Sequence, residues 1–366
     1  MLSEGNEILN ITMKKGRSLL LLSVTVLTIA LLSACNQNQT KKTAEPGAKY
    51  YRNILFSETP WDIERGSREL TPAEAASINS YKFVYDNEDR LLSVEYVRGD
   101  ELLGYGSLGG AARITYEYSD NKQIKHYFDE NNQPIESAGV FTAEYTLDEN
   151  GIRTGLKFFD KDGQPVENRN KISYYVWNIL PDGMLQEKRY NLANEETIMN
   201  PFCPFYELRF TYNDNGFVTR MANYMGDTLY NCTAENCGDI GVSYFTFAPN
   251  ENGDVEDFAV FNVTGLMSNL YWGWSKRVSK YDEYGNVLET VYFDQDNEYV
   301  GGKMVPVTQY SYDKHGALVE TKNMDKDRNI INSPENGVAI TEYKYDARGN
   351  RTETLRYDKD RVAVNI

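Results

Sequence analysis

The sequence predicts an all-β protein in which tandem β-hairpins form one elongated, curved antiparallel sheet with one short N-terminal capping helix. Three observations predict this class. A turn motif recurs in nine copies, spaced 29 to 37 residues apart when its glycine position is the mark, as in repeat architectures. Aromatic and polar residues alternate before each turn, which indicates strands. The chain has 366 residues, of which 28 are Tyr, and 13% are aromatic, a composition typical of strands.

Residues 1–34 have the pattern of an export signal that starts at Met13. A basic stretch is followed by an apolar run from Leu19 to Leu32, too short to cross a bilayer comfortably, which takes about 20 apolar residues. Leu32-Ser33-Ala34-Cys35 resembles the bacterial lipobox. This resemblance implies that the Cys35 thiol is acylated and attaches the protein to a lipid bilayer. The alternative is an ordinary secretory signal with a chance cysteine at the cleavage point.

Two short regions separate the signal from the repeats. Residues 35–49 are polar and without periodicity, which predicts a flexible tether. Residues 50–80 form an N-terminal cap, in which Thr71-Pro72-Ala73-Glu74 has the pattern of a capping box with proline at the first helical position. We therefore expect one short helix that covers the first edge strand.

Residues 81–366 form the repeat domain of nine hairpin units. Its clearest turns are Tyr281-Asp-Glu-Tyr-Gly-Asn286, Tyr312-Asp-Lys-His-Gly-Ala317 and Tyr345-Asp-Ala-Arg-Gly-Asn350. Asp-x-x-Gly suits a type I turn in which Asp bonds the local backbone and Gly takes the left-handed conformation, closing the hairpin with a bulge. A second acidic turn follows each second strand, as at Asp294-Gln-Asp296. Stacked units pair their edges and align an aromatic face, giving about eighteen strands.

These motifs resemble the Tyr-Asp repeats of bacterial rearrangement-hotspot proteins, most closely after Trp274. The resemblance covers roughly residues 81–360 and implies hairpins that curl into a spiral sheet. Large members of that family enclose a C-terminal toxin. We expect no such cargo here, because the sequence ends at Ile366, directly after the last unit.

Three irregular segments break the repeat rhythm, at residues 104–112, 195–204 and 229–274. Insertions in repeat arrays map to loops, which often carry binding sites. The last one ends in Tyr271, Trp272 and Trp274, the densest aromatic cluster of the chain. We single these three out as candidate ligand-binding residues that would stack on a sugar or peptide. The alternative is that they fill the core.

Cys203, Cys232 and Cys237 remain after lipidation of Cys35. In an exported protein they are disulfide candidates, and we expect one bond that includes Cys232, with its partner undecided. The Asp-x-Asp turns do not fit a calcium loop, and turn geometry explains them. We expect no metal and no cofactor.

The net charge of the chain and its motifs restrict the classes of function that we expect. The chain carries 38 Lys and Arg against 54 Asp and Glu, a net charge of −16, which disfavours nucleic acid as a partner. The sequence has two histidines and contains no known hydrolase, phosphate-loop or dinucleotide motif. We therefore expect no catalytic residues. We expect a non-enzymatic lipoprotein of the bacterial cell envelope, at the outer membrane rather than the inner, that binds an envelope or extracellular protein or glycan. The alternatives are a hydrolase with paired carboxylates in a groove of the sheet, and a structural envelope component.

Overall fold

The computed structural model describes residues 47–55, 62–104, 108–198, 205–231 and 241–365. These residues form 22 β-strands in one sheet and a single short helix, which confirms the predicted all-β class. All strand pairs are antiparallel, and the sheet is open, because its end strands β2 and β22 each pair with one neighbour. Over the described ranges, no helix has the length and apolar character needed to span a membrane. The expected signal and most of the expected tether lie outside the described residues.

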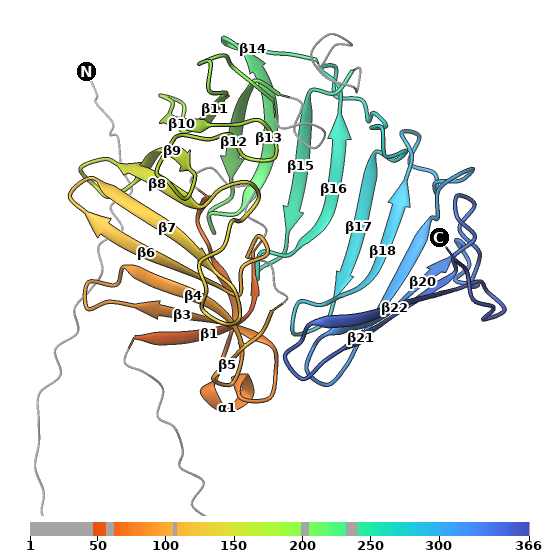
Figure 1. Ribbon diagram of the computed structural model, residues 1–366. Helices are drawn as coiled ribbons and strands as arrows, with labels where there is room; N and C mark the ends of the chain where they lie inside the picture. Colours follow the sequence, from red (N-terminus) through yellow and green to blue (C-terminus); the bar gives the residue numbers. More distant parts are fainter. Residues whose placement is uncertain (1–46, 56–61, 105–107, 199–204, 232–240, 366) are drawn as a thin grey trace, which may run out of the picture. The chain divides into compact units, whose positions relative to one another are not determined.

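Nine consecutive hairpins make up most of the sheet, as predicted, and each pairs with the next (Figure 1). They are β3 (Ser80–Tyr85) and β4 (Leu91–Arg98), β6 (Arg113–Ser119) and β7 (Lys122–Phe128), β8 (Thr142–Leu147) and β9 (Arg153–Phe159), β10 (Tyr174–Ile179) and β11 (Leu185–Tyr190), β12 (Glu207–Tyr212) and β13 (Val218–Met225), β15 (Tyr244–Pro249) and β16 (Val255–Phe261), β17 (Lys276–Tyr281) and β18 (Val287–Phe293), β19 (Val307–Tyr312) and β20 (Leu318–Met324), and β21 (Ile340–Tyr345) and β22 (Arg351–Tyr357). Two short strands, β5 (Glu101–Leu102) and β14 (Thr228–Leu229), pair with β4 and β13.

The turn of the seventh hairpin shows how the full motif closes a unit. Asp282 Oδ1 accepts hydrogen bonds from the backbone N–H groups of Tyr284 and Asn286, at 2.9 and 2.8 Å. Gly285 has φ of 77°, in the left-handed region that favours glycine. The strand register shifts between Lys280 and Tyr281. A register shift next to the turn occurs in seven of the nine hairpins, which confirms the predicted turn with its bulge in those units, whereas β6–β7 and β10–β11 pair without a shift.

In four units the tyrosine of the motif ties the unit to the preceding one: Tyr118, Tyr281, Tyr312 and Tyr345. The hydroxyl of Tyr281 donates to the Val255 carbonyl at 2.9 Å, and Tyr312 donates to the Val287 carbonyl at 3.0 Å. In both cases the acceptor is the first residue of the second strand of the hairpin before. An otherwise half-buried phenol thus gains a partner, and neighbouring hairpins gain a contact beyond their strand pairing.

The N-terminal cap differs from expectation in what covers the first edge strand. The helix α1 (Pro72–Ala75) forms with the predicted capping box, in which Thr71 and Glu74 hydrogen bond reciprocally. However, β1 (Ala48–Ile54) pairs with β3 along the edge that the helix was expected to cover. Strand β2 (Gly66–Leu70) then pairs with the other side of β1. The edge is covered by strands because a ladder satisfies the backbone groups that a one-turn helix leaves unpaired.

The curved sheet brings its two ends together. The backbone N–H of Asn79, before β3, donates to the carbonyl of His315 in the eighth turn at 2.9 Å. The N–H of Gly104 donates to the carbonyl of Arg348 in the ninth turn at 3.3 Å. Side chains of the β1–β2 hairpin also reach the fifth to eighth turns; the Arg65 guanidinium, for example, donates to the Gly216 carbonyl at 2.8 Å. Residues more than 150 positions apart in the sequence therefore meet around this hairpin.

Candidate functional site

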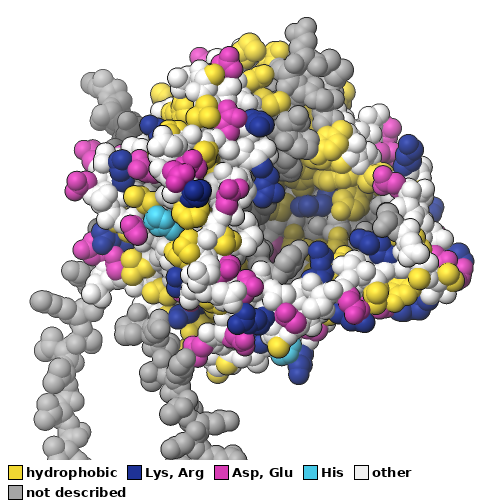
Figure 2. Space-filling view, viewed as in Figure 1, with side chains coloured by type: hydrophobic (Ala, Val, Ile, Leu, Met, Phe, Trp, Pro, Cys, Tyr) yellow, Lys and Arg dark blue, Asp and Glu magenta, His cyan; other side chains and the backbone are white. Residues whose placement is uncertain are grey.

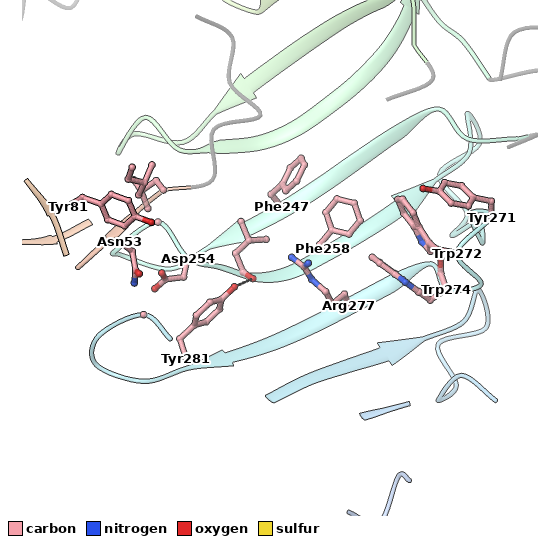
Figure 3. A pocket seen from close by; sticks show the side chains of 15 residues that line it. Asn53, Tyr81, Phe247, Asp254, Phe258, Tyr271, Trp272, Trp274, Arg277 and Tyr281 are labelled. Carbon is pink, nitrogen blue, oxygen red and sulfur yellow. Dashed lines mark hydrogen bonds between the residues drawn. The ribbon is translucent and has the colours of Figure 1, made fainter. Parts of the chain in front are cut away.

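A cavity of about 510 Å³ lies where the sixth hairpin (β15–β16), the seventh hairpin (β17–β18) and the end of β1 meet. Its walls are mainly aromatic, with Phe247 and Phe258 on one side and Tyr281 on another (Figure 3). The molecular surface is hollowed in front of β15–β18, and hydrophobic side chains gather there with several Lys and Arg (Figure 2). This combination of concavity, rings and a few polar groups is typical of ligand sites.

The three aromatic residues singled out from the sequence meet at one end of this cavity. The rings of Trp272 and Trp274 stack, with centroids 4.9 Å apart and planes at 25°. Tyr271 is 58% exposed and contacts Trp272 at 5.3 Å between centroids. The Trp272 indole N–H donates to the Trp274 carbonyl at 2.9 Å, which fixes the loop that carries both rings. Trp274 also packs edge-on against Phe258 at 5.6 Å, so the pair contacts the core and lines the cavity at once.

The cavity coincides with a break in the repeat pattern. Each hairpin has a turn motif between its two strands. We define the ring position of a unit as the residue of its first strand that lies two places before the residue that opens this motif. In the seventh unit Tyr281 opens the motif, and the ring position is Ser279, which is buried. The other eight units have an aromatic residue there: Phe83, Tyr116, Tyr145, Trp177, Phe210, Phe247, Tyr310 and Tyr343. Because serine lacks the volume of a ring, its neighbours in the seventh unit are left with unfilled space.

Arg277 is the charged residue that points into this space, and sequence reasoning missed it. Its guanidinium lies 5.6 Å from the centroid of the Phe258 ring, between Tyr281 and Trp274 (Figure 3). Its Nε is buried and has no hydrogen-bond partner among the described residues, and none of them forms an ion pair with Arg277. The signal that could have found it is the loss of the aromatic residue at the ring position two residues later.

Three other polar side chains of the cavity, Asp254, Asn53 and Tyr281, have partners within the protein. Asp254 is the one carboxylate among the described lining residues. It accepts hydrogen bonds from both terminal nitrogens of Arg68, and the distance from Nη1 to Oδ1 is 2.8 Å. Asn53 donates to the Tyr284 carbonyl at 2.6 Å. The Tyr281 hydroxyl donates to a backbone carbonyl, and burial raises its pKa, so it stays neutral at physiological pH. The β1–β2 hairpin thus completes the cavity wall.

A second group of buried charges lies under the residues that precede β2. Lys125 Nζ donates to Asp62 at 2.8 Å and to Glu64 at 2.7 Å, and the Tyr145 and Tyr116 hydroxyls donate to the same two carboxylates. Burial alone would lower the pKa of Lys125, but the Asp62 and Glu64 charges outweigh it and raise the pKa well above its usual value. The lysine is therefore charged throughout the physiological range and fastens this segment to the second and third hairpins.

A cavity of about 250 Å³ is bordered by two carboxylates, Asp62 and Glu187. Burial would raise the pKa of Asp62, but the charges of Lys125 and Arg153 lower it below its usual value. Burial raises the pKa of Glu187, and the Asp62 charge adds to the effect. Glu187 accepts the indole N–H of Trp177 at 2.8 Å and Nε of Arg189 at 2.9 Å. Each carboxylate is thus held by a cation of the protein.

Several sequence-based candidates fall elsewhere. Cys35, Cys203, Cys232 and Cys237 lie outside the described residues, so acylation and disulfide bonding stay predictions. Within the described ranges, no cluster of His, Cys, Asp and Glu could hold a metal ion. The Asp-x-Asp turns use their carboxylates locally: Asp294 Oδ1 accepts two backbone N–H groups at 3.0 Å.

Comparison with known proteins gives limited matches. A scan against protein-family models and a search of curated proteins each found no match. Similar solved structures include crystal structures of TcdB2-TccC3-TEV, of TcdB2-TccC3 without the hypervariable C-terminal region and of TcdB2-TccC3-Cdc42. Sequence identities are 12%, 12% and 13%, and TM-scores are 0.20, 0.22 and 0.20. The matches cover 79%, 76% and 79% of this chain but only 16%, 14% and 18% of those chains. Similarity at this level carries no information about ligand or activity.

Proposed function

We propose that this protein is a non-enzymatic scaffold that binds a glycan in the cavity beside Trp272 and Trp274. The observation that carries the proposal is the stacked tryptophan pair at one end of a cavity of about 510 Å³. That volume lies within the range of roughly 300–1,000 Å³ for sites that enclose small ligands. A pyranose ring has an apolar C–H face that packs on aromatic faces, while its hydroxyls need hydrogen-bond partners. The aromatic walls and Arg277 offer both kinds of contact.

The chemistry of the cavity supports binding rather than catalysis. Hydrolysis of a glycosidic bond generally uses two carboxyl groups on opposite sides of the bond. The described lining offers Asp254 alone, and its two oxygens are occupied by Arg68. A bound sugar would meet rings and a cation but no free acid or base.

The proposal includes attachment to the cell envelope through Cys35. Its support is the resemblance of Leu32-Ser33-Ala34-Cys35 to the lipobox, with polar residues between it and β1. A tether of this kind would hold the binding domain near glycans of the envelope or outside the cell. Mass spectrometry of the protein extracted from its native membrane tests this part: an unmodified Cys35 would contradict it.

Binding is tested by screening the purified protein against an array of bacterial and extracellular glycans and measuring affinities for the hits by calorimetry. We expect Trp272→Ala and Trp274→Ala to weaken binding about tenfold or more, since each aromatic contact is worth about 1 kcal/mol or more. Tyr299→Ala is the matched control, because Tyr299 is a 39% exposed ring outside the cavity. Melting temperatures identify variants that fail to fold. Absence of any glycan ligand, or equal affinities for all variants, would refute the proposal.

The alternative function is a hydrolase that uses Asp62 and Glu187. The observation in its favour is that two carboxylates with oppositely shifted pKa values border one cavity, an arrangement found in acid–base pairs. Incubation of the same glycans with wild-type protein and with Glu187→Gln tests it. Turnover that disappears in the variant would replace the binding proposal with this one.

A further inference from the structure

We infer that the ligand of the tryptophan cavity carries a single carboxylate, which Arg277 binds, on an otherwise neutral glycan. This inference rests on the proposed glycan-binding function and adds the chemical class of the ligand.

The position of Arg277 is unusual within the repeat. It lies two residues before the ring position and opposite Tyr292 in the strand ladder. The first six units have apolar side chains at the equivalent place: Tyr81, Ile114, Ala143, Tyr175, Leu208 and Phe245. Placing a guanidinium where the first six units place an apolar group costs free energy unless the charge has a partner.

Several other cations buried in the sheet have carboxylate partners within the protein. Arg189 Nε donates to Glu187 at 2.9 Å, and Arg209 Nε donates to Glu207 at 2.9 Å. Lys125 has two carboxylate partners. Arg277 has none among the described residues, and the carboxylate that shares its cavity, Asp254, is held by Arg68.

The geometry of the Arg277 guanidinium favours a carboxylate as its partner in the ligand. Its N–H groups form a planar fork that matches the two oxygens of a carboxylate, and such charge-assisted pairs are about twice as strong as neutral hydrogen bonds. A sugar acid that stacks on Trp274 would place its carboxylate next to this fork, because Arg277 lies between Trp274 and Tyr281 (Figure 3).

The charge of the whole protein limits the number of carboxylates. With a net charge of −16, the protein repels a polyanion at long range. A ligand with one acidic residue among neutral ones keeps the local pair with Arg277 and avoids most of that repulsion. We therefore expect a sparsely acidic glycan and not a polyuronate.

The test uses a trisaccharide with one glucuronate residue and its carboxyl-reduced counterpart, in which CH₂OH replaces the carboxylate. Calorimetry on the full-length protein should show a preference of about tenfold for the acidic sugar, the size expected for one charge-assisted hydrogen-bond pair. Arg277→Met should abolish this preference, so that the two sugars bind with equal affinity. Arg277→Lys should keep part of it.

Lys276→Met is the control for net charge, because Lys276 lies on the opposite face of β17 and pairs with Asp257 at 3.0 Å. It should retain the full preference. If wild-type protein binds the two sugars equally, the inference is wrong and the proposed function stands. If it binds neither sugar and no other glycan, both are wrong. Loss of the preference in Lys276→Met as strongly as in Arg277→Met would also overturn the role of Arg277.

Discussion

The N-terminal hairpin contacts the eighth turn at its glycine, Gly316. The φ of Gly316 is 78°, and a Cβ added there would collide with the guanidinium of Arg52. Arg52 is buried, and its Nη2 donates to Asn286 Oδ1 at 2.7 Å and to the Gly316 carbonyl at 2.8 Å. Gly183, in the fourth turn, has nearly the same φ of 82°, but a Cβ added there would meet no atom within 4 Å. Replacing each glycine with alanine therefore separates backbone strain from the contact with Arg52.

The magnitudes follow from these contacts. Left-handed backbone costs an L-residue about 1–2 kcal/mol, so Gly183→Ala should lower the free energy of unfolding by that amount. Gly316→Ala has the same backbone cost and also displaces Arg52. Losing one hydrogen bond to a charged group costs about 1.5–3 kcal/mol. We expect Gly316→Ala to cost about 2.5–5 kcal/mol in all.

Urea unfolding followed by far-ultraviolet circular dichroism measures the free energy of unfolding of both variants. A change in stability appears as a shift of the urea midpoint while the slope of the free energy against urea concentration stays unchanged. Arg52→Met supplies the decisive comparison, because it removes the group with which the new methyl collides. In that background Gly316→Ala should cost only about 1–2 kcal/mol, a coupling of about 2 kcal/mol. Equal losses for Gly183→Ala and Gly316→Ala, or full additivity with Arg52→Met, would show that the Arg52 contact contributes nothing to stability.

Two further predictions concern charged groups. Lys125→Met leaves two half-buried carboxylates without their cation and should cost about 3–5 kcal/mol, whereas Lys122→Met, at a 48% exposed ion pair, should cost less than about 1 kcal/mol in the same unfolding assay. Hydrogen bonding from Arg328 lowers the pKa of Glu289 from 4.5 to about 2. Because the folded-state pKa is the lower one, this stabilisation is complete above pH 4.5 and is lost as the pH falls toward 2. Arg328→Met should therefore flatten the acid limb of a stability–pH curve; an unchanged limb would contradict the assignment.

The hairpin array could be predicted because its determinants are local. Tyr345-Asp-Ala-Arg-Gly-Asn350 contains the whole turn, from the Asp346 cap to the positive φ of 75° at Gly349. The alternation of Tyr343 and Tyr345 gives the strand and its buried face. The capping box at Thr71 is equally local. Each of these signals lies within a few residues, so one sequence was enough to reveal them.

The N-terminal hairpin could not be predicted, because its determinants are distant. Residues 48–54 contain no turn motif, and the contacts that place them join Arg52 to a residue 264 positions away. Nothing in residues 66–70 marks them as the far edge of the sheet. The Trp272 and Trp274 pair was visible as a cluster, but its cavity depends on Asn53 from β1 and Phe247 from β15. Such a site becomes visible only when the chain is folded.

The cavity shows how a repeat array acquires a distinct site. Eight units place a ring at the same position, and an array of identical units offers no place that differs from any other. The seventh unit departs from it twice, with Ser279 in place of a ring and Arg277 in place of an apolar residue. The loop before this unit adds Trp272 and Trp274 at the same point. Arg277 and the two tryptophans line one cavity. These departures from the repeat are costly for packing, and a bound ligand that fills the cavity and neutralises the guanidinium would recover part of that cost.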